Sequence, residues 1–98
     1  MSEPEPEIGR EEHDTGGRYV IVIEGHVAEM TYSRAGTGLI IIDHTGVPDE
    51  LRGRRLGSFL VRRAVQDARE RNVKIVPLCP FAASEFQRHP DYADVLSR

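Results

Sequence analysis

An amphipathic segment between two aliphatic segments constrains the fold of this chain more than any other feature. From Leu56 to Arg71, apolar residues recur at helical spacing while charged residues fill the other positions, which predicts a helix that packs on one face. Leu39–Thr45 and Val73–Cys79, both rich in aliphatic residues, are typical of strands. Strand, helix and strand in this order predict a βαβ unit with parallel strands.

The segments before and after this unit complete the expected fold. Arg18–Glu24 is rich in β-branched residues, His26–Arg34 alternates apolar and polar residues, and a tight turn at Glu24-Gly25 would join them as a hairpin. Phe81–Arg88 and Pro90–Leu96 are typical of two short helices. The sequence therefore predicts an α/β (α+β) fold, in which a mixed sheet combines antiparallel N-terminal strands with one parallel pair.

Residues 1–17 differ in composition from the rest of the chain. They are rich in Glu and Pro, and Ile8 is their only aliphatic residue beyond the initiator methionine. Such a segment buries too little apolar surface to offset the entropy lost on ordering. We therefore predict a disordered acidic tail over residues 1–17 and one folded domain over residues 18–98.

Bulk composition excludes several classes of protein. The formal net charge of -3 gives no general attraction to nucleic acid or to an anionic membrane. Cys79 is the single cysteine and the four histidines are scattered, so neither an intrachain disulfide nor a metal site is expected. No apolar run long enough to cross a membrane and no secretory signal is visible. We expect a cytoplasmic protein, either a monomer or a weak homodimer.

A glycine-containing loop leads into the predicted helix. Leu51–Gly57 combines two glycines, Gly53 and Gly57, with three arginines, and a helix N-terminus carries unpaired N–H groups that attract anions. The plain alternative is a glycine helix start with solvated arginines. The loop has neither the Gly-Lys-Ser/Thr ending of nucleoside triphosphate sites nor the Gly-x-Gly-x-x-Gly of dinucleotide sites. The residues of the loop alone leave the phosphate site and the plain helix start both open.

The wider stretch Val47–Val61 resembles the acetyl-CoA-binding motif of the GNAT superfamily. That motif reads Arg or Gln, two variable residues, Gly, one variable residue, then Gly or Ala. Arg52 and Gly57 match its ends, and Arg55 stands where the superfamily has its middle glycine. The chain is also similar to a small stand-alone subgroup of predicted acetyltransferases in three further segments: His44–Pro48, Val76–Phe81 and His89–Tyr92.

The resemblance implies a mixed sheet whose parallel strands part near Val47 and Cys79, with the pantetheine arm of acetyl-CoA in the gap. Backbone groups near Thr45 to Val47 would hold this arm, and the loop amides would hold the pyrophosphate. The residues expected to bind the co-substrate are Thr45, Val47, Arg52, Gly53, Arg54, Arg55, Leu56, Gly57 and Ser58.

His44 and Cys79 are the candidate catalytic residues. His44, near the end of a strand, could accept a proton from an amine, or simply pack at the strand end. Cys79 could protonate the leaving thiolate, form an acyl-enzyme, or be a small buried hydrophobe. Asp43 should point to the opposite face from His44 in a regular strand, whereas a bulge would change this. Glu29 is another possible base.

The resemblance implies an N-acetyltransferase that transfers an acetyl group directly from acetyl-CoA to an amine acceptor. The alternative is a non-catalytic acyl-CoA-binding module, because the chain lacks segments with which larger GNAT enzymes shape an acceptor pocket. A nucleic-acid surface would need aromatic residues or a reading helix beside the arginines, and neither is evident. We therefore expect acetyl-CoA and an amine as partners, without nucleic acid or membrane.

Overall fold

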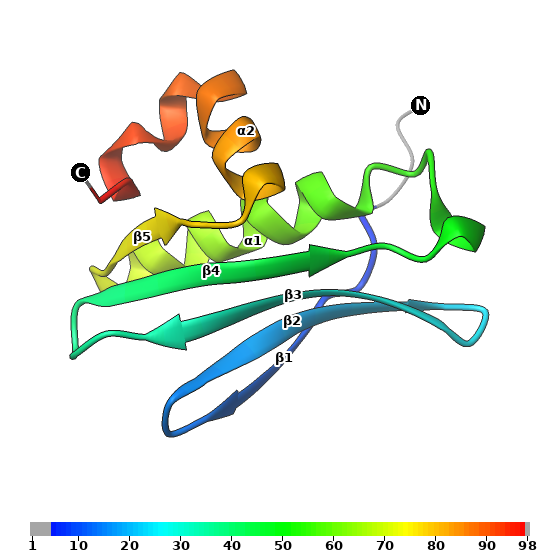
Figure 1. Cartoon of the computed structure of the whole chain (residues 1–98), viewed down its shortest axis with the longest axis horizontal. Coiled ribbons are helices and arrows are strands. Elements are labelled where there is room, and N and C mark those ends of the chain that lie inside the picture. Colours follow the sequence, from blue (N-terminus) through cyan, green and yellow to red (C-terminus); the bar gives the residue numbers. More distant parts are fainter. Residues whose placement is uncertain (1–4, 98) are drawn as a thin grey trace.

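The computed structural model describes residues 5–97, which form one five-stranded sheet with helices on one side (Figure 1). The strands lie side by side in chain order: β1 (Gly9–His13), β2 (Gly16–Ile23), β3 (His26–Arg34), β4 (Leu39–Gly46) and β5 (Lys74–Pro77). The pairs β1–β2, β2–β3 and β3–β4 are antiparallel, and the pair β4–β5 is parallel. The predicted α/β (α+β) fold with a mixed sheet is confirmed.

The helical elements follow β4 and β5. They are the 3-10 turn η1 (Asp49–Leu51), helix α1 (Leu56–Arg71), helix α2 (Pro80–Arg88) and the 3-10 segment η2 (Pro90–Val95). The predicted bounds of α1 are confirmed. Asn72 ends this helix in the left-handed conformation and donates its N–H to Ala68 and Arg69, which is a common helix ending. None of the helices in residues 5–97 has the length and apolar character needed to span a membrane.

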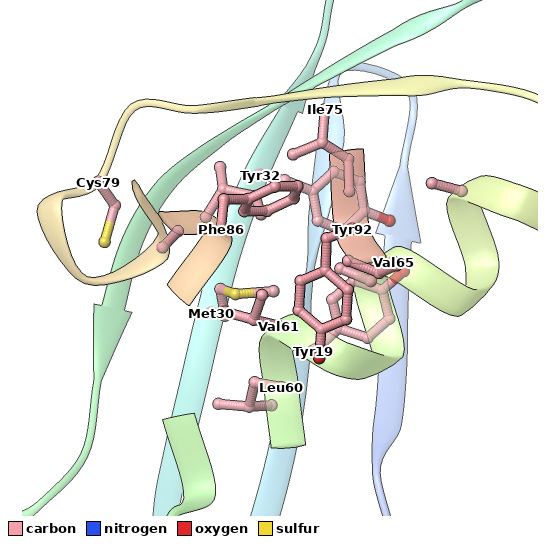
Figure 2. Packing of buried hydrophobic residues seen from close by; sticks show 14 of the residues in the cluster. Tyr19, Met30, Tyr32, Leu60, Val61, Val65, Ile75, Cys79, Phe86 and Tyr92 are labelled. Carbon is pink, nitrogen blue, oxygen red and sulfur yellow. The ribbon is translucent and has the colours of Figure 1, made fainter. Parts of the chain in front are cut away.

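The core lies between the sheet and α1. One face of α1 presents Leu60, Val61 and Val65 to the inward side chains of the sheet, among them Tyr19 and Met30 (Figure 2). Farther along the same core, Phe86 of α2 and Tyr92 of η2 meet edge to face with ring centroids 5.7 Å apart. The opposite face of the sheet has no helix over it in the described part of the chain, and Val22 and Val27 are exposed there (Figure 1).

The hairpin between β2 and β3 forms where the sequence predicts it. Glu24 and Gly25, the two turn residues, have φ of 53° and 79°. Positive φ at both central positions defines the turn that best matches the twist of an antiparallel pair. The adjacent register pairs Ile23 with His26, which fixes the alternation of inward and outward side chains along both strands.

The predicted disordered tail over residues 1–17 requires a correction. Residues 9–13 form β1, which pairs with β2, and the second strand begins at Gly16 instead of Arg18. Residues 1–4 of the predicted tail lie outside the described residues. Polar contacts hold β1 in place: Asp67 of α1 accepts hydrogen bonds from Arg10 at 3.1 Å and from Tyr19 at 2.8 Å.

A second polar group on β1 strengthens this attachment. Glu12 accepts hydrogen bonds from Tyr32 at 2.9 Å and from Arg71 at 3.1 Å, and it is also ion-paired with Arg34. The Glu- and Pro-rich composition of residues 1–17 predicts disorder only if buried apolar surface is the sole source of stability for the segment. Here charged side chains on β3 and α1 supply partners that the tail sequence by itself does not reveal.

Candidate functional site

The two parallel strands part at the end of β5. Their ladder runs from Leu39 paired with Lys74 to Ile42 paired with Pro77. Beyond it, the amides of Leu78 and Cys79 both donate to the carbonyl of Ile42, at 3.2 and 3.0 Å, and the chain turns into α2. Strand β4 continues to Gly46, and among residues 5–97 only β3 pairs with this last part of it. One edge of β4 is therefore left without a strand partner at the gap.

A β-bulge in β4 lies beside this gap. Ile42 pairs with Tyr32, and His44 pairs with Thr31, the residue next to Tyr32 in β3. Asp43, which lies between Ile42 and His44, therefore has no paired residue in β3 and is the extra residue of the bulge. The expectation for a regular strand, with Asp43 and His44 on opposite faces, fails for this reason. Asp43 accepts a hydrogen bond from the hydroxyl of Ser33 at 2.8 Å.

The bulge assigns the polar residues of β4 to the two faces of the sheet. Thr45 pairs with buried Met30 and therefore lies on the helix side, whereas His44 pairs with Thr31 and lies on the open face. Ser33 alternates with buried Tyr32, so the Asp43 carboxylate that it binds also lies on the open face. Asp43 and His44 are both exposed. They form a polar pair on the side of the sheet away from the helices.

Cys79 lies on the helix side of the gap, at the N-cap of α2 and at the margin of the core (Figure 2). Its Sγ is 3.5 Å from Oγ1 of Thr45. Burial opposes ionisation of this thiol, but hydrogen bonds with the Thr45 hydroxyl and with the backbone amides of Phe81 and Ala82 outweigh it and lower the pKa of Cys79. The structure thus brings Cys79 to Thr45, while His44 lies on the other face of β4.

The loop before α1 has the backbone of an anion cradle. Gly53 has φ of 83°, and Arg55, the N-cap residue, has φ of 59° and ψ of 29°. The superfamily glycine therefore corresponds to a left-handed position, which this chain fills with arginine. No side chain caps α1, and its first turn has no acidic residue. The first N–H groups of the helix are consequently available to an anion.

A groove of about 310 Å³ connects this loop with the gap between the strands. It is lined by seven of the nine residues predicted to bind the co-substrate, together with two others, Leu51 and Phe81. The seven are Thr45, Val47, Arg52, Gly53, Arg55, Leu56 and Gly57.

The other two predicted residues, Arg54 and Ser58, do not line this groove. Arg54 lies 3.9 Å from the carboxylate of Glu24. Ser58 lines an adjoining cavity of about 450 Å³ between α1 and α2, which also contains the basic side chains Arg62 and Arg88. Arg55 lines both spaces and so joins them.

Phe81 is a groove residue whose contact with the loop the sequence does not reveal. A Cβ placed on Gly57 would lie 2.7 Å from Cζ of Phe81, so the ring packs directly on the start of α1. The side chain is still 38% exposed. The position of Phe81 just after Val73–Cys79, a predicted strand at the gap, is the signal in the sequence that points to this groove.

Glu29, the other possible base, and Tyr92 of η2 both have structural partners. Glu29 is ion-paired with Arg18 at 2.7 Å on the open face of the sheet, so its carboxylate is already occupied. Tyr92 is buried against Phe86 and stacks on His89. Residues 5–97 contain no group of His, Cys, Asp or Glu side chains that could hold a metal ion.

Known proteins that are similar to this chain identify the family of a protein with this gap, loop and groove. The family model for the GCN5-related N-acetyl-transferases matches residues 18–95. The chain belongs to this family. A GCN5-like candidate N-acetyltransferase from Staphylococcus aureus, solved by NMR, is similar at 35% identity over 91% of this chain and 87% of that one, with a TM-score of 0.70. No curated protein matches the chain.

Proposed function

We propose that this protein is an N-acetyltransferase that transfers an acetyl group from acetyl-CoA to an amine. The observation that carries the proposal is the uncapped N-terminus of α1, which opens onto the groove where β4 and β5 part. Family membership supports the reaction class. A single free thiol and a donor made inside cells are both compatible with the cytoplasm as the place of action.

The donor would lie along the groove from the loop to the gap. N–H groups of Leu56, Gly57 and Ser58 would bind the pyrophosphate, because they end a helix and have no side-chain cap. In the described part of the chain, the edge of β4 beyond Ile42 has no strand partner, so its backbone near Thr45 can pair with the amides of the pantetheine arm. Arg62 and Arg88, in the adjoining cavity, are ion-paired with Glu5 at 2.8 Å and with Glu85 at 3.4 Å, so phosphates of the nucleotide end would have to replace these carboxylates.

The chemistry requires one proton to be removed and one to be supplied. Acetyl-CoA supplies the thioester, at whose carbonyl carbon the C–S bond breaks as the amine nitrogen forms the new C–N bond. His44 would accept the proton that the acceptor ammonium loses, since imidazole titrates near neutrality. Cys79 would protonate the leaving thiolate, and its lowered pKa makes it a stronger acid than an ordinary thiol.

Donor binding is tested by following amide NMR signals during titration with acetyl-CoA. We expect signals from residues 52–58 and from Thr45 to move, and those of the β1–β2 turn at Asp14 and Thr15 to stay in place. If the loop amides do not respond at millimolar acetyl-CoA, the donor assignment is wrong.

Catalysis is separated from simple binding with a panel of amines and chromatographic detection of CoA and acetylated product. His44→Ala should abolish turnover while acetyl-CoA still binds, and His26→Ala, a change at a half-buried histidine on the neighbouring strand, should retain it. Absence of turnover with every amine would favour the non-catalytic acyl-CoA-binding module. Intact mass measured during turnover distinguishes direct transfer from an acyl-enzyme on Cys79.

A further inference from the structure

Glu85 of α2 is a buried carboxylate with one unused oxygen. The residue is 1% exposed, and within residues 5–97 its Oε1 has no hydrogen-bond partner. Nε2 of His89 lies 3.7 Å from Oε1, which is too far for a hydrogen bond, and a guanidinium nitrogen of Arg88 lies 3.4 Å from the other oxygen, Oε2. Buried polar atoms in folded proteins nearly always have a partner, so a ligand that donates to Oε1 would complete this site.

The carboxylate lines the cavity of about 450 Å³ between α1 and α2. Three other residues of the lining carry rings: Phe59, His89 and Tyr92. His89 and Tyr92 stack on each other with ring centroids 4.7 Å apart, which holds the imidazole in place before a ligand binds. Side-chain rings beside a cavity favour a flat ligand that stacks on them. The volume is many times the roughly 30 Å³ that a water molecule occupies, so an organic ligand fits.

The outer part of the same cavity is basic. Arg55, Arg62 and Arg88 line it and are exposed. Arg62 is ion-paired with Glu5 at 2.8 Å, but both side chains are more than half exposed, so this pair is weak and a phosphate can replace the carboxylate. Three arginines exceed the two carboxylates beside them, Glu5 and Glu85, and guanidinium groups bind phosphate with paired hydrogen bonds. A flat ligand with a donor at one end and a phosphate at the other is a nucleotide.

The buried carboxylate also selects among the bases. A carboxylate accepts hydrogen bonds and donates none. Guanine presents two adjacent donors on one edge, the ring N1–H and the 2-amino group. Adenine presents a ring acceptor beside its 6-amino donor, and cytosine does the same beside its 4-amino donor, so each would direct a lone pair at the carboxylate. Guanine is therefore the base that matches an acceptor-only group.

We propose that this cavity binds a guanine nucleotide, whose base donates to Glu85 and whose phosphate contacts Arg62 and Arg88. Binding itself does not depend on the acetyltransferase reaction. Arg55 lines both this cavity and the groove assigned to acetyl-CoA, so a bound guanine nucleotide would compete with the phosphate end of the donor. This second, regulatory step rests on the proposed function.

NMR titration with GMP and with AMP, without acetyl-CoA, tests the binding site. GMP should move the amide signals of Ser58, Glu85 and His89, leave Asp14 and Thr15 in place, and bind about tenfold more tightly than AMP, as is typical of one well-placed base contact. IMP, which keeps N1–H but lacks the 2-amino group, should bind with intermediate affinity. The proposal is overturned if AMP binds as tightly as GMP, or if the GMP shifts map outside the cavity.

Two variants separate reading of the base from binding of the phosphate. Glu85→Gln replaces an acceptor with an amide that matches adenine, so the preference for GMP should disappear and AMP should bind more tightly than before. Arg88→Gln should weaken GMP and AMP by the same factor, because phosphate contacts carry no information about the base. Glu70→Gln is the matched control, since it makes the same chemical change at an exposed residue of α1 outside the cavity lining, and it should change neither affinity.

Circular dichroism establishes that each variant is folded. A folded Glu85→Gln protein that still prefers GMP would contradict the role of the carboxylate. If this variant does not fold, the comparison of GMP, IMP and AMP in the wild-type protein, together with Arg88→Gln, still decides the matter.

Acetyl transfer tests the regulatory step separately. GMP should raise the KM for acetyl-CoA and leave kcat unchanged, and the effect should be lost in Glu85→Gln. If GMP binds in the cavity but the KM for acetyl-CoA does not change, the competition is wrong. If GMP binds and no amine is ever acetylated, the proposed function fails and the nucleotide site stands. Active acetyl transfer by a protein that does not bind GMP would instead overturn this inference alone.

Discussion

The contact between Gly57 and Phe81 allows a quantitative prediction for one added methyl group. In Gly57→Ala the new Cβ would lie 2.7 Å from Cζ and 2.8 Å from Cε2 of Phe81. Carbon atoms pack best at about 3.5–4.0 Å, so the overlap approaches 1 Å. Because Phe81 is 38% exposed, its ring can swing outward, but it then loses apolar contact with α1.

Two effects of opposite sign determine the size of the change. Overpacking of this kind costs about 1–3 kcal/mol. Alanine is favoured over glycine within a helix by about 1 kcal/mol. Gly57→Ala should therefore destabilise the wild-type protein by about 1 kcal/mol but stabilise a Phe81→Ala variant by up to about 1 kcal/mol. The coupling energy between the two positions should be about 2 kcal/mol.

The measurement is a double-mutant cycle by urea and thermal unfolding, followed by circular dichroism. In a domain of this size, 1 kcal/mol corresponds to a change in Tm of about 4–8 °C. Gly38→Ala is the matched control, because a Cβ at Gly38 meets nothing within 4 Å. Its effect should be the same in both backgrounds. An equal effect of Gly57→Ala in both backgrounds would refute the packing argument.

Three further predictions concern the loop, the thiol and the first strand. Arg55→Gly should stabilise the fold by about 0.5–1 kcal/mol in thermal unfolding, whereas Arg55→Ala should not, because only glycine relieves the left-handed backbone. Thr45→Val should raise the pKa of Cys79 in a thiolate absorbance titration; an unchanged pKa would contradict the role of the hydroxyl. Burial opposes ionisation of Glu12, but hydrogen bonds from Tyr32 and Arg71 outweigh burial and lower its pKa. Ionised Glu12 therefore stabilises the fold fully above the ordinary glutamate pKa, and this contribution to the free energy of unfolding is lost as the pH falls through the lowered pKa of Glu12. Glu12→Gln should thus cost about 1 kcal/mol near pH 7 and nothing in strong acid, as measured by urea unfolding.

Local patterns predicted the elements that depend on local residues. The spacing of apolar residues gave both ends of α1, because its buried stripe and the left-handed Asn72 lie within the segment itself. The hairpin at Glu24-Gly25 followed from the β-branched residues of Arg18–Glu24, the alternation in His26–Arg34 and the short turn between them. The order of strand, loop, helix and strand predicted the parallel pair, and the family resemblance implied both the gap between these strands and the co-substrate expected in it.

Features that depend on distant partners could not be predicted in the same way. Strand β1 has few apolar residues, and its stability comes from contacts such as Arg10 with Asp67, which are 57 positions apart. The bulge at Asp43 depends on the register against β3, which no pattern within β4 specifies. The contact of Phe81 with Gly57 likewise depends on how α2 packs against α1.

The two edges of the sheet have a consequence for how the protein behaves at high concentration. A long, flat, apolar edge strand offers unpaired N–H and C=O groups to other chains and promotes aggregation. Here one edge is β1, a short strand that carries Arg10, Glu11 and Glu12. At the other edge, Ile75 of β5 forms a bridge with Leu96 and accepts a hydrogen bond from Ser97 at 2.8 Å. Both outer edges therefore resist the addition of a further strand, and within residues 5–97 the segment of β4 beyond Ile42 is where the sheet still offers unpaired backbone groups.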